Sequence, residues 1–130
     1  MKVELLNGAN LAFIGDAYYE LMIRKYLIEK GITNQKELHK NDVKYVSASG
    51  HYKIYKKMEE DNFLTEEEMI YFKRGRNHDY HVSRRNLNLD EYLTSSGFEA
   101  VIGFLFLLDK KDRLKEIIDY SIKVIEDKNE

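Results

Sequence analysis

The stretch that decides the fold runs Asn10-Leu-Ala-Phe-Ile-Gly-Asp-Ala-Tyr-Tyr-Glu-Leu-Met-Ile-Arg-Lys-Tyr-Leu-Ile-Glu-Lys-Gly31. Apolar side chains recur in it every three or four residues, which is the period of a buried helix face, and glycine is a typical residue just after a helix. We therefore predict one long helix that ends at Gly31. The residues expected on its buried face are Leu11, Ile14, Tyr18, Leu21, Met22 and Ile28.

Asp16 is the anomaly of this helix. Phe13, Ile14 and Tyr19 surround it on the helical cylinder, and a buried ionised carboxylate is strongly unfavourable unless something pairs with it. Gly15 beside it costs a helix about 1 kcal/mol relative to alanine, which indicates that another element packs very closely there. Two interpretations stay open: Asp16 binds a partner through its charge, or it faces water or a nearby Arg or Lys.

The composition favours a soluble, all-helical protein. A chain of 130 residues with 43% hydrophobic content is expected to form one domain, 1–130. Because it has no Cys, no signal-like N-terminus and no apolar run long enough to span a bilayer, we expect a cytoplasmic protein without a membrane partner. The absence of Pro and of alternating strand patterns predicts an all-α fold.

The net charge of -2 hides an asymmetry along the chain. Residues 31–85 hold 11 basic and 9 acidic side chains, whereas residues 86–130 hold 6 basic and 10 acidic ones. The middle of the chain therefore carries the positive surface, and the overall charge does not exclude an anionic partner.

The basic residues concentrate in Lys73-Arg-Gly-Arg-Asn-His-Asp-Tyr-His-Val-Ser-Arg-Arg-Asn86, which has no apolar periodicity and is predicted to be a loop. Arginine forks suit phosphate oxygens, so this loop either contacts nucleic acid or is a solvated turn. His78 and His81 have a spacing that suits a metal, but no Cys or third ligand lies nearby, so we predict no metal there. The candidate RNA-binding residues are Lys73, Arg74, Arg76, Arg84 and Arg85.

Shorter patterns predict the remaining outer helices. Thr33 is expected to cap a short helix that ends near His39, and Asp42 to cap a longer one that runs to Glu60. The capping box Thr65-Glu-Glu-Glu68 opens another helix. The last helix is predicted from Asp109 to about Asp127.

A second special stretch is Ser95-Ser-Gly-Phe-Glu-Ala-Val-Ile-Gly-Phe-Leu-Phe-Leu-Leu108, which is apolar on every side and is predicted to be the central buried helix. Glu99 is its only charge. One interpretation is a capping box, Ser96-x-x-Glu99, at the start of the helix. The other interpretation is that Glu99 and Asp16 together bind Mg²⁺, which takes one or two carboxylates and keeps several waters. Such a site would activate a water for attack on a phosphodiester.

The two carboxylate segments together resemble the catalytic domain of ribonuclease III. Phe13-Ile-Gly-Asp-Ala17 is similar to that family's signature, and Phe98-Glu-Ala-Val-Ile-Gly103 to its second acidic helix. Nearly the whole chain is similar to the small bacterial group of mini-ribonucleases III, which lacks the separate double-stranded RNA-binding domain. The similar segments are Asn7-Gly8, Gly15-Asp16, Glu20, Arg24, 38–40, 46–48, 65–68, 73–77 and 98–100.

The resemblance implies a ribonuclease III-like helical bundle that cleaves double-stranded RNA with Mg²⁺. It makes Asp16 and Glu99 the metal-binding catalytic pair and Lys73 to Arg76 part of an RNA-contacting surface. The mini group further implies maturation of the 23S ribosomal RNA precursor, and leaves open whether a ribosomal protein presents that substrate. Full-length ribonuclease III has acidic residues where this chain has Ala12 and Ser96. The resemblance therefore leaves open whether one or two metal ions bind. The alternative is a non-catalytic RNA-binding or ribosome-associated module.

The apolar excess of the two long helices also predicts a homodimer. Segments 11–28 and 98–108 are apolar over more of their circumference than a small bundle can bury. The resemblance implies pairing through the signature helix about a two-fold axis. We expect Phe13, Ala17, Tyr18 or Met22 at the interface.

Overall fold

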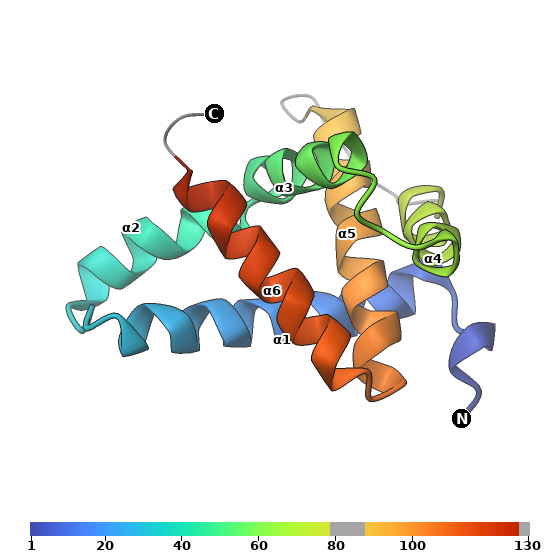
Figure 1. Ribbon diagram of the computed structural model, residues 1–130, viewed down its shortest axis with the longest axis horizontal. Coiled ribbons are helices and arrows are strands. Elements are labelled where there is room, and N and C mark those ends of the chain that lie inside the picture. Colours follow the sequence, from blue (N-terminus) through green and yellow to red (C-terminus); the bar gives the residue numbers. More distant parts are fainter. Residues whose placement is uncertain (79–87, 128–130) are drawn as a thin grey trace.

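The computed structural model describes residues 1–78 and 88–127, and every regular element in these two ranges is a helix. The prediction of an all-helical fold is therefore confirmed. The elements are a short 3-10 turn, η1 (Val3–Leu5), followed by α1 (Gly8–Glu29), α2 (Gln35–Val46), α3 (Ala48–Glu60), α4 (Glu66–Arg76), α5 (Leu89–Leu107) and α6 (Lys111–Glu126) (Figure 1).

Helix α5 is the centre of the fold, as its sequence predicts. Its residues from Thr94 to Phe98 and from Ala100 to Leu105 are all buried. It contacts α1, α3, α4 and α6, and its contact with α1 is the most extensive in the described chain. Figure 1 shows α1 and α5 crossing at a steep angle, with α6 passing in front of α1.

Two glycines let α1 and α5 touch backbone to backbone. A Cβ at Gly15 of α1 would lie 1.8 Å from the carbonyl oxygen of Glu99, and one at Gly103 of α5 would lie 1.9 Å from that of Leu11. No other residue fits at either position without moving a helix. The expectation of close packing at Gly15 is confirmed, and the crossing places Asp16 beside Glu99.

The buried face of α1 differs in part from the predicted one. Leu11 is buried as expected, but Leu21 and Ile28 are exposed, so the prediction is wrong for them. The contact at Gly15 fixes the rotation of the helix, and the residues that follow it at intervals of four become the inner face. The buried residues of α1 are Gly8, Leu11, Ala12, Gly15, Tyr19, Ile23 and Leu27.

The boundary between α2 and α3 also differs from the prediction. Asp42 does not cap a helix, because α2 continues through it to Val46 and buries it. Ser47 caps α3 instead, its Oγ accepting a hydrogen bond from the Gly50 N–H at 3.1 Å. Likewise Asn34, rather than Thr33, caps α2. The turn is sharp because Gly50 comes so close to the Lys44 carbonyl that a Cβ would lie 2.4 Å from it.

Helix α4 begins with the predicted capping box. Thr65 Oγ1 accepts from the Glu68 N–H, and the Glu68 carboxylate accepts from the Thr65 N–H. That carboxylate also receives two hydrogen bonds from Arg113 of α6, at 2.7 and 2.9 Å. The helix continues through Arg76, so the prediction that the loop begins at Lys73 is wrong.

Candidate active site

The crossing of α1 and α5 brings the two predicted catalytic carboxylates together. Burial is the main cause that raises the pKa of Glu99 to about 9, and the negative charge of Asp16 adds to it. Hydrogen bonding with the Asp16 side chain acts on the pKa of Glu99 in the same direction. The two side chains therefore form a single acidic pair, in which Glu99 keeps its proton to a higher pH than an ordinary carboxyl does.

The surroundings of the pair differ from those expected. Asp16 is exposed and not set inside the apolar helix, because the rotation of α1 turns it outward. The Glu99 side chain is 16% exposed. Glu99 also lies in the middle of α5, which begins at Leu89 with Asn88 as its cap. The interpretation of Ser96-x-x-Glu99 as a capping box is therefore wrong, and Glu99 has no capping role.

Two more acidic residues lie near the pair, Glu20 on α1 and Asp42 on α2. Glu20 lies one turn after Asp16, adds negative charge near Glu99 and pairs with Arg24 at 2.6 Å. Asp42 is buried, and burial followed by the nearby Glu20 carboxylate raises its pKa. The spacing of four from Asp16 could have identified Glu20 as a neighbour. Asp42 was missed because it was expected to cap a helix.

A buried imidazole lies against Glu99 on the core side. His51 of α3 is 0% exposed, and its Nδ1 lies 2.7 Å from Ser95 Oγ and 3.8 Å from Glu99 Oε2. Burial lowers its pKa to about 3, so the ring is neutral and the contact with Glu99 is not an ion pair. No pattern in the sequence signals this contact, since it joins positions 44 residues apart, 51 and 95.

The acidic pair suits a hard divalent cation. Asp16 is exposed and Glu99 is partly exposed. Mg²⁺ binds through one or two carboxylates while keeping several waters. A bound cation would compensate the negative charge of Asp16, which adds to the effect of burial on the pKa of Glu99. In the ranges 1–78 and 88–127 no group of three or more His, Cys, Asp or Glu forms a more complete cage. Ala12 and Ser96 are both buried and add no charge.

The basic end of α4 packs against α5. A Cβ at Gly75 would lie 2.5 Å from Ala100 Cβ, so the last turn of α4 packs against the turn of α5 that carries Glu99. Lys73 is exposed there. Arg84 and Arg85 lie outside the described residues.

Two of the candidate RNA-binding arginines have partners within the protein. Arg74 donates hydrogen bonds to the carbonyl oxygens of Glu4 and Leu6, at 2.7 and 3.1 Å. Arg76 pairs with Asp90 at the start of α5. Arg74 therefore fastens the N-terminal segment to α4, and Arg76 joins α4 to α5.

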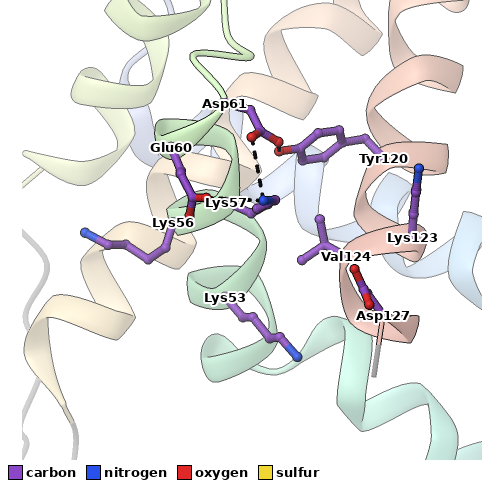
Figure 2. Close-up of a pocket in the computed structure, with 9 residues that line it drawn as sticks. All are labelled: Lys53, Lys56, Lys57, Glu60, Asp61, Tyr120, Lys123, Val124 and Asp127. Carbon is purple, nitrogen blue, oxygen red and sulfur yellow. Dashed lines mark hydrogen bonds and ion pairs between the residues drawn. The ribbon is translucent and has the colours of Figure 1, made fainter. Parts of the chain in front are cut away.

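A groove of about 420 Å³ between α3 and α6 is separate from the pair (Figure 2). Neither Asp16 nor Glu99 lines it. Its lysines on α3 are largely neutralised, since Lys56 pairs with Glu59 and Lys57 with Glu60. The lining residues are Lys53, Lys56, Lys57, Glu60, Asp61, Tyr120, Lys123, Val124 and Asp127.

Within the part of the chain that the structure describes, no helix combines the length and apolar character needed to cross a membrane.

Comparisons with known proteins assign the chain to a family. The Ribonuclease III domain matches residues 9–110, which include both carboxylates. Mini-ribonuclease 3 of Streptococcus pneumoniae is 41% identical over 126 residues, covering 97% of this chain and 98% of that protein. Mini-ribonuclease 3 of Staphylococcus aureus is 35% identical over 126 residues, with 97% and 94% covered. A crystal structure of a Fusobacterium nucleatum protein matches with a TM-score of 0.80 and 38% identity, covering 90% of this chain and 93% of that one. The chain therefore belongs to the ribonuclease III family, and within it to the mini-ribonuclease III group.

Proposed function

We propose that this protein is a Mg²⁺-dependent endoribonuclease that cleaves double-stranded RNA, with Asp16 and Glu99 as its metal-binding catalytic pair. The family assignment supports the enzyme class and the duplex substrate. The observation that carries the assignment of residues is the meeting of the two carboxylates at the α1–α5 crossing, where Glu99 has no structural role as a cap.

The reaction is hydrolysis of a phosphodiester, in which water attacks phosphorus and the 3′ oxygen leaves. When bound, Mg²⁺ supplies the Lewis acid that lowers the pKa of a coordinated water. The chain itself contributes the carboxylate oxygens of Asp16 and Glu99. Phe98 and Ala100, both buried, fix the turn of α5 that carries Glu99.

The basic end of α4 is the proposed RNA-contacting surface. Double-stranded RNA offers phosphates and 2′-hydroxyls in a shallow minor groove, so it is recognised largely by shape and charge. Lys73 is exposed and could contact a phosphate, whereas Arg74 and Arg76 already have partners within the described part of the protein. Arg84 and Arg85 stay predictions from the sequence.

An exposed apolar stripe on α1 supports the proposed homodimer. Phe13 is 82% exposed and Leu21 is 59% exposed, and they lie on one face of the helix with the exposed Ala17 between them. Packing against a second copy would remove this surface from water. A two-fold pairing would provide one acidic pair for each strand of a duplex.

The enzyme hypothesis is tested with the purified protein and a structured duplex RNA. Cleavage is expected with Mg²⁺ and not with EDTA. Asp16→Asn and Glu99→Gln should each abolish cleavage while the helical content and RNA affinity stay close to those of the parent. RNA binding without cleavage under any divalent cation would instead favour the non-catalytic module. Near-normal cutting by either variant would refute the assigned pair.

The proposed natural substrate is the 23S ribosomal RNA precursor, which the resemblance to the mini-ribonuclease III group implies. A transcript that carries the paired ends of the precursor should be cut at defined positions, and an unrelated duplex of equal length less efficiently. Adding ribosomal proteins to the same transcript tests whether one of them presents it. Equal cutting of both duplexes under all these conditions would argue against this substrate.

A further inference from the structure

His51 and Ser95 form a buried polar contact directly behind the acidic pair. Ser95 lies one helical turn before Glu99 on α5, and His51 reaches both from α3. The rings of Phe98 and Tyr19 enclose the imidazole, with centroids 4.8 and 5.0 Å away. The imidazole is therefore fixed from several sides, while the Glu99 side chain that it contacts is partly exposed, at 16%.

The contacts of the ring define which nitrogen carries its proton. Nε2 is buried and has no hydrogen-bond partner among the described residues. An unpaired buried N–H is costlier than an unpaired lone pair, so the proton belongs on Nδ1. Nδ1–H then donates to Ser95 Oγ, and its positive end also faces Glu99 Oε2. The other tautomer would place a lone pair against the carboxylate.

We propose that His51 is a positioning residue for Glu99, whose carboxylate it orients toward the divalent cation shared with Asp16. The inference rests on the proposed function, because it needs that cation. Ser95 acts indirectly. By accepting a hydrogen bond from Nδ1–H, it fixes the orientation of the ring that faces Glu99. Residues that orient metal ligands in this way typically change metal affinity or activity by about 10- to 100-fold when they are removed.

Binding of Mn²⁺ to the RNA-free protein, followed by electron paramagnetic resonance, tests this role without any catalytic step. His51→Leu keeps an apolar side chain in the core but removes the N–H, and should weaken Mn²⁺ binding about 10- to 100-fold. His51→Asn places an amide N–H near the position of Nδ1 and should restore binding to within about threefold of the parent. The Mg²⁺ concentration for half-maximal cleavage should shift in parallel.

Ser95→Ala provides a second variant, with Ser121→Ala as its matched control. Ser121 is also a fully buried helical serine, but it donates to the Ile117 carbonyl in α6. Ser95→Ala should weaken Mn²⁺ binding, and Ser121→Ala should lower only thermal stability. If His51→Leu does not fold, Ser95→Ala decides in its place. An unchanged Mn²⁺ isotherm in the folded variant overturns the proposal.

Glu99→Gln separates failure of this inference from failure of the proposed function. If the parent binds Mn²⁺ and Glu99→Gln does not, the acidic pair is the metal site, and the His51 variants test only the positioning role. If Glu99→Gln binds Mn²⁺ as the parent does, the proposed function itself is wrong, and the role of His51 fails with it.

Discussion

The backbone of Gly15 rests on that of Glu99 so closely that a Cβ at Gly15 would lie 1.8 Å from the Glu99 carbonyl oxygen. This contact sets the distance between α1 and α5, and with it the distance between the carboxylates of Asp16 and Glu99. The acidic pair therefore depends on a residue that has no side chain.

Gly15→Ala is expected to destabilise the protein and to abolish cleavage, because the added methyl must push two helix backbones apart. Overpacking of this kind costs about 1–3 kcal/mol or more. Gly31→Ala is the matched control, since Gly31 has no atom within 4 Å of its Cβ position and only its φ of +97° opposes the change. Thermal melts and cleavage rates per folded molecule distinguish the two. Full activity in Gly15→Ala would show that the pair tolerates separation.

Glu99→Gln should stabilise the protein in the absence of divalent cations. The pKa of Glu99 rises on folding from its ordinary 4.5 to about 9, so the stability it contributes is complete below pH 4.5 and is lost as the pH rises toward 9. The difference in unfolding free energy between Glu99→Gln and the parent should grow by at least about 1 kcal/mol between pH 5 and pH 8.

Chemical denaturation at several pH values measures this difference, and Glu67→Gln, at an exposed position on α4, serves as the control. Added Mg²⁺ should raise the melting temperature of the parent but not that of Glu99→Gln, because the cation binds the ionised pair. A difference that does not vary with pH would mean that Glu99 is already ionised in the metal-free protein.

Lys73→Ala and Arg74→Ala should have different effects although the residues are adjacent. Lys73→Ala is expected to leave stability unchanged and to reduce the slope of log affinity for duplex RNA against log salt by about 0.7 to 0.9, the loss of one phosphate contact. Arg74→Ala removes hydrogen bonds to the carbonyls of Glu4 and Leu6 and should lower stability by about 2 kcal/mol. An unchanged salt slope in Lys73→Ala would remove this residue from the RNA surface.

Local patterns in the sequence predicted where the helices lie better than they predicted which face of each helix is buried. The capping box at Thr65 and the all-round apolar α5 depend on neighbouring residues, and both predictions are confirmed. The exposure of Asp16 depends instead on how α1 packs against α5, a segment more than 80 positions away. The apolar pattern of α1 alone carries no information about that contact. The same holds for His51, whose contacts with Ser95 and Glu99 exist only in the folded chain.

The candidate site residues could be predicted mainly from the resemblance to a known family. The family membership and enzyme class are confirmed. The structure places Asp16 near Glu99, and their role as a metal-binding catalytic pair stays a prediction. The resemblance gave no indication that Arg74 donates hydrogen bonds within the protein. A run of basic residues has the same sequence whether its side chains contact phosphates or carbonyl oxygens.

The last prediction concerns the apolar stripe of α1. Phe13→Asp should convert a homodimer into a monomer, because two copies of the new carboxylate would meet near a two-fold axis. Sedimentation at micromolar concentration should give a mass near twice 15.5 kDa for the parent and near 15.5 kDa for the variant. Val43→Asp changes another exposed apolar residue, 58% exposed, that lies on α2, and this variant should remain dimeric. Because each protomer carries a single acidic pair, the monomeric variant should nick duplex RNA on one strand at a time, whereas the parent should make paired, staggered cuts. A monomeric parent, or a monomeric variant that still cuts both strands together, would show that the stripe serves another purpose.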